Sequence, residues 1–517
     1  MTTLAALALA AVVSAVGLSD LRFLRVAQRE HYLAGSCSRF AARWWHSSAA
    51  NCGLVVVAVA GVVCSGVAAG FGLLTAAAIC IGPIGLSLRG RTSRLVATGR
   101  LVTLAAVLAA FEAIVLAAGA AAGGLGGAVV AGAAVAFLVP LLADAALAVT
   151  APVEARRSRR FVASAASRLE RFAPLVVAVT GSYGKTTTKG YIAHLAGGMR
   201  AVLPSPHSFN NALGLARTVN EHLGPGVEVL VAEMGTYGRG EIADICAWLR
   251  PAISVITAIG PVHLERFKSL DTTLAAKAEI IEHADVVVLN GDDERLAGLA
   301  KDLDSSSKKV VVTSGVDPSA AVAVLGTPSG LELHFSGTRV GCVVVGENDR
   351  PSATSNVACA AAAALELGAS PEAVLARLAS LPVAANRLQR YEAKEGYVVL
   401  DDTFNSNPVG SRVALQRLAG ETGTGRRVVV TPGMIELGPL QREENAAFAE
   451  AAAALGAEIV VVGRTNRAAL REGARRAAGG DRLRLVRRIG DAVAVVRAEL
   501  GAGDAVLYEN DLPDHFP

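Results

Sequence analysis

The stretch that decides the fold is Val179-Thr180-Gly181-Ser182-Tyr183-Gly184-Lys185-Thr186-Thr187-Thr188. An apolar, β-branched run at 175–180 predicts a buried strand, and residues 189–196 favour a helix. A glycine-bracketed turn between them points backbone N–H groups at one spot, where the helix N-terminus adds partial positive charge. We therefore predict a phosphate-binding loop. Lys185 would contact β- and γ-phosphate oxygens of a nucleoside triphosphate, and the Thr186 hydroxyl would hold Mg²⁺.

The composition of the 517 residues is unusual for a soluble enzyme, because 52% are hydrophobic and only 18% are charged. The first 150 residues hold most of this apolar excess. The net charge of +4 is modest and favours no nucleic-acid partner. The seven cysteines are scattered without a CxxC pair, which is typical of small buried side chains in a reducing compartment.

Five apolar segments predict a helical membrane domain at residues 1–150. They cover 3–18, two helices within 52–88 that turn near 66–72, 101–121, and about 125–149. The run 52–88 is too long for one crossing at about 20 residues per span. The first segment lacks the basic start of a signal peptide, so we expect it to be retained.

Arginines predict how this domain is oriented. They cluster after the first segment, between the third and fourth, and after the fifth: Arg22, Arg25, Arg29, Arg39, Arg43; Arg89, Arg91, Arg94, Arg100; and Arg156, Arg157, Arg159, Arg160. By the positive-inside rule these regions are cytoplasmic, and so is the rest of the chain. Glu112 and Asp144 lie within the fourth and fifth segments, where an acid is either functional or part of a polar contact between helices.

The remaining sequence predicts two α/β domains after a basic linker at 151–171. Short apolar runs alternate with helical stretches, which indicates parallel sheets. The strand candidates are 175–180, 228–233, 252–257, 285–290, 309–313, 397–401, 427–431, 458–462 and 504–508. Residues 316–346 predict a small β insertion. A break near Pro382 separates a central ATP-binding domain (172–383) from a Rossmann-like domain (384–517).

Several predicted strands and helices carry polar groups at their ends. Glu233 ends a buried strand, where α/β folds place their ligands, and its carboxylate suits Mg²⁺. His263 follows the next strand, and Lys277 lies on the helix after it. Polar residues also end the strand at 289–293 and open the last domain at 399–408. Each of these elements alone is weak evidence for a functional site; a lone lysine on a helix, for example, is usually a solvated surface residue.

Taken in order, these elements closely resemble the Mur ligase family, and within it the MurF-type branch. The matching pieces are 180–189, Asn210-Asn211 with Gly214, 233–235 with 240–242, 260–265, 277–281, 290–293, Asn356 with its alanine run, Arg387-Leu388, 401–408 and 434–438. The resemblance covers about residues 172–517.

The resemblance implies an ATP-dependent ligase that forms an amide bond through an acyl phosphate. ATP would contact Gly181, Ser182, Tyr183, Gly184, Lys185, Thr186, Thr187, Asn356, Arg387 and Asp402. Magnesium would be held by Thr186, Glu233, His263 and Lys277, with Lys277 carbamylated as in several members of the family. Lys185, Lys277 and His263 would be catalytic. Asn210, Asn211, Asn405 and Asn407 would face the substrates, with Asn405 and Asn407 near the amine.

The chain also departs from the family. Membrane spans stand where MurF-type enzymes have their UDP-binding domain, so we expect a peptide acceptor that is either a small molecule or lipid-linked. Gly433 stands where Asp is common, and 508–513 replaces a Lys-Gly-Ser run. Alternatives are a membrane-bound ligase resembling polyglutamate synthases, a ligase of a secondary-metabolite pathway, and an idle ATP-binding scaffold. The sequence identifies no protein partner.

Overall fold

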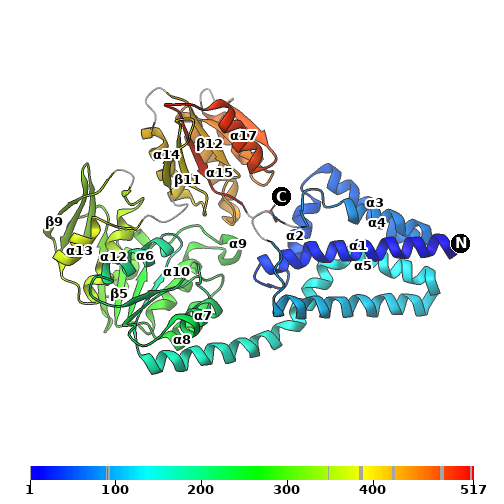
Figure 1. Cartoon of the computed structure of the whole chain (residues 1–517), viewed down its shortest axis with the longest axis horizontal. Coiled ribbons are helices and arrows are strands. Elements are labelled where there is room, and N and C mark those ends of the chain that lie inside the picture. Colours follow the sequence, from blue (N-terminus) through cyan, green and yellow to red (C-terminus); the bar gives the residue numbers. More distant parts are fainter. Residues whose placement is uncertain are drawn as a thin grey trace. The chain divides into compact units, whose positions relative to one another are not determined.

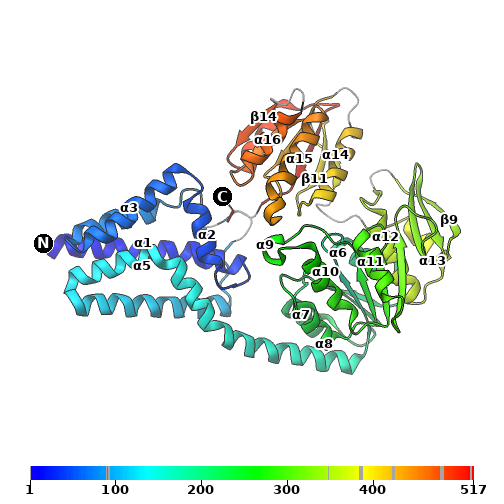
Figure 2. The same ribbon diagram turned by 180° about the vertical axis from the view of Figure 1, so that it is seen from behind.

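The computed structural model describes residues 2–516 except 89, 91–93, 207, 347–348, 383–387, 422–424, 478–481 and 513–514. The chain divides into two units, drawn in Figure 1 and from behind in Figure 2. The first unit comprises Met1–Arg157, Gly463–Thr465 and Leu512–Pro517. The second comprises Ser158–Val462 and Asn466–Asp511.

The first unit is helical. Its elements are α1 (Thr2–Arg29), α2 (Ser36–Trp45), α3 (Ala49–Ser65), η1 (Ala69–Phe71), α4 (Gly72–Ile81) and most of α5 (Gly99–Phe172). Apolar helices therefore stand at all five predicted segments, and the predicted turn near 66–72 is confirmed. Within the described residues, α1 and α5 are long and apolar enough to cross a membrane. The bent pair α2 and α3 would make a third such element.

Helix α5 folds back on itself at two glycines. Gly123 (φ −147°, ψ 23°) and Gly124 (φ 56°, ψ −140°) leave helical geometry, so the element consists of two helical arms. The arms approach closely beside the turn, since a Cβ atom on Gly127 would lie 2.1 Å from the carbonyl oxygen of Gly119. Small residues thus permit the tight hairpin between the fourth and fifth apolar segments.

The arginines predicted in the loop after the first apolar segment lie in helices instead, so that part of the prediction is wrong: Arg22, Arg25 and Arg29 belong to α1, and Arg39 and Arg43 belong to α2. Arg22 and Arg25 are 6% and 1% exposed. The Arg22 guanidinium donates to the carbonyls of Ile79 (2.7 Å), Cys80 (2.9 Å) and Gly82 (2.7 Å) at the end of α4. These carbonyls have no partner within their own helix, so they are free to accept from Arg22. The hydrogen bonds offset the cost of burying the guanidinium charge.

The two acids within the apolar segments both make contacts between helices. Asp144 accepts hydrogen bonds from the backbone N–H groups of Cys37 (3.1 Å) and Ser38 (2.9 Å) and so caps the start of α2. Glu112 is 7% exposed, and its carboxyl group interacts with that of Asp20 in α1. Of the two roles left open by the sequence, these contacts favour the polar contact between helices.

The segment after the last strand also belongs to the first unit. The indole N–H of Trp44 donates to the carbonyl oxygen of His515 (2.7 Å), whose ring lies 3.0 Å from a carboxylate oxygen of Glu30. The Phe516 ring meets Phe40 edge-on at 5.1 Å between centroids. Aromatic side chains of α2 therefore hold this segment.

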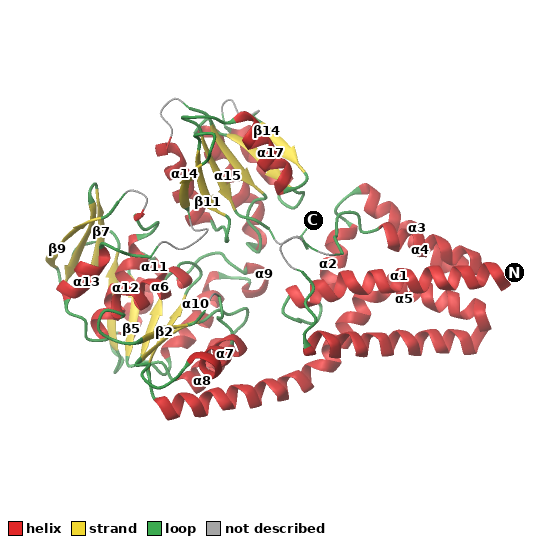
Figure 3. Cartoon of the chain, viewed as in Figure 1, coloured by secondary structure: helices red, strands yellow, loops and turns green. Residues whose placement is uncertain are grey.

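The second unit contains a sheet of nine strands among the described residues, ordered β2-β3-β1-β4-β5-β6-β7-β8-β9. Figure 3 draws the strands in yellow. Strands β1 to β7 run parallel. The strands are β1 (Leu175–Thr180), β2 (Val202–Pro204), β3 (Val229–Glu233), β4 (Ile253–Ile256), β5 (Val286–Asn290), β6 (Lys309–Ser314), β7 (Val322–Thr327), β8 (Gly330–Phe335) and β9 (Thr338–Val344). The five predicted strands of this domain are confirmed, whereas β2 was missed.

Helices cover both faces of this sheet and form two hydrophobic cores. They are α6 (Lys185–Ala196), α7 (Ala212–His222), α8 (Glu241–Leu249), α9 (Leu264–Phe267), α10 (Leu270–Ala278), η2 (Glu279–Ile281), α11 (Glu294–Leu303), α12 (Thr354–Glu366) and α13 (Pro371–Leu378). Residues 357–364 of α12, six of them alanine, are fully buried. Their small side chains bring α12 close to the strands and to α6.

The predicted β insertion is an antiparallel meander, β7-β8-β9, but it is not separate from the main sheet. Thr313 and Ser314 of β6 pair in parallel with Val322 and Ala323 of β7, which joins the meander to the sheet edge. The sequence indicated a β insertion here from its content of Gly, Val, Ser and Thr. It did not show the pairing partner, because that contact is made by backbone groups alone.

A second sheet of six described strands follows, ordered β10-β11-β15-β12-β13-β14, with β10 antiparallel. Its elements are β10 (Gln389–Glu392), β11 (Val398–Asp402), α14 (Pro408–Glu421), β12 (Arg427–Thr431), η4 (Gly438–Leu440), α15 (Gln441–Ala454), β13 (Glu458–Val462), α16 (Arg467–Arg476), β14 (Leu483–Val486), α17 (Ile489–Glu499) and β15 (Ala505–Glu509). The four predicted strands are confirmed, and the edge strands β10 and β14 were missed. The parallel core of this sheet supports the predicted Rossmann-like fold.

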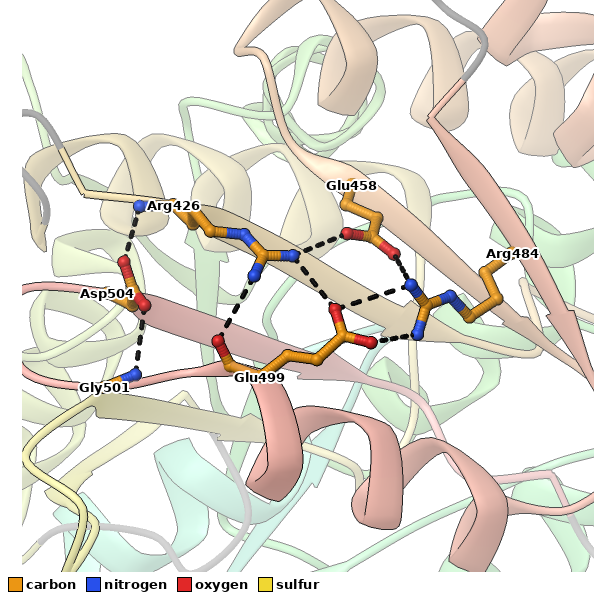
Figure 4. A network of polar contacts seen from close by, with 6 residues as sticks. All are labelled: Arg426, Glu458, Arg484, Glu499, Gly501 and Asp504. Atoms are coloured by element: carbon orange, nitrogen blue, oxygen red, sulfur yellow. Dashed lines mark hydrogen bonds and ion pairs between the residues drawn. The ribbon is translucent and has the colours of Figure 1, made fainter.

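Ion pairs bind the amino ends of these strands together, as Figure 4 shows. Arg426, just before β12, contacts Glu458 (3.0 Å) and Glu499 (3.2 Å), and Arg484 contacts both glutamates. Asp504, just before β15, accepts from the backbone N–H of Arg426 at 2.7 Å. This edge is occupied by structural contacts, so the carboxyl ends of the strands are the edge left for ligands.

Candidate active site

The loop between β1 and α6 requires its two glycines. Gly181 (φ +149°) and Gly184 (φ +78°) adopt backbone angles that side chains disfavour. A Cβ atom on Gly181 would lie 2.0 Å from Oγ1 of Thr257, and one on Gly184 would lie 2.2 Å from Oδ1 of Asn356. The second approach places Asn356, predicted to contact ATP, directly beside the loop.

Hydrogen bonds to the end of β4 fix the shape of this loop. The backbone N–H of Ser182 donates to the carbonyl of Ala258 (2.7 Å), and the Ser182 hydroxyl contacts both backbone groups of Gly260. The Tyr183 ring packs on Gly260, where any Cβ atom would collide with it. Burial raises the pKa of the Tyr183 hydroxyl, so this side chain serves as packing rather than as an acid or base.

Two lysines meet at the loop. Lys185, at the start of α6, donates to the carbonyl oxygen of Gly181 at 2.8 Å, and Lys277 of α10 donates to the same oxygen at 3.1 Å. Lys277 is 2% exposed. Burial, and then the positive charge of Lys185, hold the pKa of Lys277 well below its ordinary value. The structure thus brings together two predicted catalytic residues and favours the neutral amine at Lys277.

Glu233 ends β3 in a buried polar cluster. One carboxylate oxygen lies 3.1 Å from Nζ of Lys189, and both side chains are almost fully buried. The other oxygen accepts from Nδ2 of Asn210 at 3.2 Å. Asn210 was predicted to face substrate, and the structure places it beside the predicted metal ligand.

His263, also predicted to bind magnesium, takes part in a different contact. It adopts a left-handed backbone conformation (φ +54°), and its Nδ1 contacts a carboxylate oxygen of Glu436, in the loop after β12. The N–H of Leu264 also donates to the carbonyl of Glu436 at 2.9 Å. Among the described residues, three or more His, Cys, Asp or Glu side chains nowhere gather as a ready metal site. The predicted magnesium ligands are therefore divided between separate contacts.

Two predicted substrate residues use their side chains as helix caps. Oδ1 of Asn211 accepts from the N–H of Gly214 (2.8 Å) at the start of α7, and Oδ1 of Asn407 accepts from Gly410 (2.9 Å) at the start of α14. Asn405 is exposed, and Asp402 accepts from the N–H of Leu388 at 3.1 Å. Arg387 lies outside the described residues. Thr186 and Thr187 belong to the first turn of α6.

Sequence reasoning missed two charged residues at this site. Lys189 lies four residues after Lys185, one helical turn further on the same face, and that spacing could have identified it. Glu436 lies within the 434–438 motif, but its contact with His263 joins residues 173 positions apart. No local pattern predicts such a pairing.

Comparisons with known proteins agree with this geometry. Residues 179–364 match the Mur ligase middle domain, and residues 386–508 match the domain described as Mur ligase, glutamate ligase domain. The UDP-N-acetylmuramoyl-tripeptide–D-alanyl-D-alanine ligase of Mycobacterium tuberculosis H37Rv is 33% identical over 360 residues, which is 65% of this chain and 70% of that protein. The chain belongs to the Mur ligase family.

Further relatives place this Mur ligase near the MurF type. The ligase of the same name from Bacillus subtilis 168 is 29% identical over 278 residues, covering 53% of this chain and 59% of that protein. The crystal structure of MurF from Acinetobacter baumannii superposes with a TM-score of 0.58 at 25% identity, covering 68% of this chain and 77% of that one. Both domain matches begin after the helical first unit.

The departure at Gly433 has a structural reason in this Mur ligase. Gly433 has φ +79°, and a Cβ atom there would lie 2.3 Å from Oδ1 of Asn445 and 2.7 Å from Nδ2 of Asn466. Nδ2 of Asn510 donates to the Gly433 carbonyl at 2.7 Å. Three buried amides therefore fill the space beside the backbone, and a side chain at position 433 does not fit.

Proposed function

We propose that this Mur ligase uses ATP to join an amine, such as the amino group of D-alanyl-D-alanine, to the carboxylate of a UDP-muramoyl-tripeptide or a related acceptor. The observation that carries the proposal is the convergence of Lys185 and Lys277 on the carbonyl of Gly181 in a glycine-shaped phosphate loop. The identity with MurF-type relatives across both catalytic domains supports the choice of substrates.

The reaction has two balanced steps. The acceptor carboxylate attacks the γ-phosphorus of ATP, which forms an acyl phosphate and releases ADP. The amine then attacks the acyl carbon, losing a proton as inorganic phosphate leaves. We assign Lys185 and the amides of the loop to the phosphate oxygens, where they reduce the repulsion between the two anions. Asn356 beside the loop is suited to face the adenine.

The residues present fit a magnesium site with a modified lysine. The Lys277 amine is buried beside a second cation and favours its neutral form, which is the form that reacts with CO₂. Carbamylation would convert this neutral amine into a carbamate anion and release one proton. That group, together with Glu233 and the Thr186 hydroxyl, offers the oxygen ligands that Mg²⁺ prefers. The metal would supply charge neutralisation at the transferred phosphoryl group.

We further propose that the helices of the first unit cross the cytoplasmic membrane and keep both catalytic domains in the cytoplasm. The lengths of α1 and α5 support spans, and the arginine distribution supports the orientation. An acceptor at the membrane, lipid-linked or otherwise associated, would then be available to the catalytic domains.

The reaction is tested with detergent-purified full-length protein, Mg²⁺, ATP, UDP-muramoyl-tripeptide and D-alanyl-D-alanine, by measuring phosphate release and product mass. A product that Lys185→Ala abolishes supports the proposal. Lys309→Ala is the matched control, because Lys309 is an exposed lysine at the start of β6. If ATP binds but no product forms, the same assay with a lipid-linked muramoyl-peptide decides between the two acceptors. Failure with both contradicts the proposed reaction.

The orientation has its own test, because Cys342 of β9 is exposed in the catalytic unit. In a variant that keeps Cys342 and replaces the other cysteines with alanine, a membrane-impermeant maleimide should label inverted membrane vesicles and spare right-side-out ones. Labelling from the outer side would contradict the cytoplasmic assignment. Extraction of the protein by alkaline carbonate would contradict the spans.

A further inference from the structure

A carboxyl group is buried at the end of β15, in the middle of the second sheet. Glu509 is 1% exposed, and its strand lies between β11 and β12. One carboxyl oxygen contacts the hydroxyl of Ser406, and the other has no hydrogen-bond partner among the described residues. Burying a carboxyl group whose second oxygen has no hydrogen bond lowers the stability of the fold. A functional role of Glu509 would explain its position despite this cost.

The partner of Glu509 lies in the loop that carries predicted substrate residues. This loop joins β11 to α14 and is fixed at both ends. Oδ1 of Asp401 accepts from the N–H (3.1 Å) and the hydroxyl (2.6 Å) of Thr403, and Asn407 caps α14. Ser406, 6% exposed, is the buried contact between these ends, next to the exposed Asn405.

The charge state of Glu509 suits a hydrogen-bonding role rather than a salt bridge. Glu509 and Asp402 are register partners on neighbouring strands. Burial, and then the negative charge of Asp402, raise the pKa of Glu509 well above its ordinary value. The neutral acid can hold Ser406 as donor or acceptor, and an amide of the same shape can do the same.

From this geometry we infer that Glu509 is a positioning residue for the amine substrate. It holds Ser406, and through it sets the position of Asn405 at the carboxyl edge of the second sheet. The inference rests on the proposed function, because the amine is the substrate assigned to this loop. It also explains why a carboxyl side chain stands in the 508–513 segment, where the sequence leaves the family pattern.

The test compares Glu509→Ala, Glu509→Gln and Ser406→Ala in full-length protein. We expect Glu509→Ala and Ser406→Ala to lower kcat/KM for D-alanyl-D-alanine by roughly ten- to a hundredfold, with KM for ATP within about twofold. Glu509→Gln should stay within about threefold of wild type. The double variant Glu509→Ala/Ser406→Ala should have a kcat/KM no lower than that of the more impaired single variant, because both changes remove the same contact. Glu499→Gln, in the ion-pair network of Figure 4, is the matched control for an unrelated glutamate of the same domain.

Hydrogen exchange separates this inference from the proposed function. Amides of residues 403–407 should exchange faster in Glu509→Ala than in wild type, and at the wild-type rate in Glu509→Gln. This readout needs no turnover, so it holds even if wild-type protein forms no product. An unchanged KM for the amine in Glu509→Ala, or a Glu509→Gln variant as impaired as Glu509→Ala, would overturn the positioning role.

Discussion

The buried pair of Lys189 and Glu233 gives the sharpest stability prediction. The two charged groups are 3.1 Å apart with side chains 6% and 2% exposed. At an effective dielectric constant of about 20, their attraction is about 5 kcal/mol. Removing one member leaves the other charge buried without this compensation, and such changes cost about 3–5 kcal/mol. We expect Lys189→Met, which keeps the length of the side chain, to destabilise the central domain by that amount.

Thermal unfolding of the detergent-purified protein measures this loss. Trp248 of α8 packs against the core of the central domain, so its fluorescence reports on that domain when Trp44 and Trp45 are replaced by phenylalanine. For a domain of this size, 1 kcal/mol shifts Tm by roughly 2–4 °C, so Lys189→Met should lower Tm by roughly 6–20 °C.

Two controls identify the cause of the shift. The double variant Lys189→Met/Glu233→Gln removes both charges and should recover most of the lost stability. Arg217→Met breaks an ion pair of similar length (2.9 Å) whose side chains are 56% and 46% exposed, and it should cost less than about 1 kcal/mol. A Lys189→Met protein that melts within 2 °C of its parent would refute the reasoning from burial.

Three further predictions concern other parts of the chain. The unfolded chain releases the Glu509 proton as pH rises through about 4.5, whereas the folded chain keeps it. Wild-type stability should therefore fall by up to about 1.4 kcal/mol per pH unit above that point, and the stability advantage of Glu509→Gln should grow as pH rises above it in chemical denaturation. Gly433→Ala places a Cβ atom 2.3 Å from Oδ1 of Asn445 and should cost about 1–3 kcal/mol in the same assay. Asp144→Ala removes the cap of α2 and should cost about 1 kcal/mol, seen as faster amide exchange at the start of that helix.

Much of the fold could be predicted because parallel strands buried on both faces are continuous apolar runs. Runs such as 286–290 and 458–462 stand out between polar turns. Of the fifteen strands among the described residues, nine were placed individually from sequence, and the three strands of the meander were predicted only as a β insertion. The missed strands β2, β10 and β14 are edge strands of three or four residues. An edge strand is paired on one side only, so its side chains carry a weaker signal.

The site could be predicted only to the level of strand and loop ends. Parallel strands share their carboxyl edge, so the sequence brings Glu233 and the phosphate loop to one region. Which side chains make contact in this region depends on their length and rotamer, and the sequence pattern does not specify either. Arg22 in α1 shows the same limit, because its role depends on helix-end carbonyls nearly 60 residues away in the sequence.

We propose that the second domain takes part in metal binding through the contact between Glu436 and His263. Metal-ligating histidines commonly use one ring nitrogen for the metal while a carboxylate holds the other. Glu436 contacts Nδ1, so Nε2 is the nitrogen that would remain for magnesium. On this argument, Glu436→Gln should weaken Mn²⁺ binding, measured by electron paramagnetic resonance without substrates, by roughly ten- to a hundredfold. Glu332→Gln changes a surface carboxylate that contacts His334 in the meander and serves as control. Tighter binding in Glu436→Gln would instead mean that the carboxylate competes with the metal for His263.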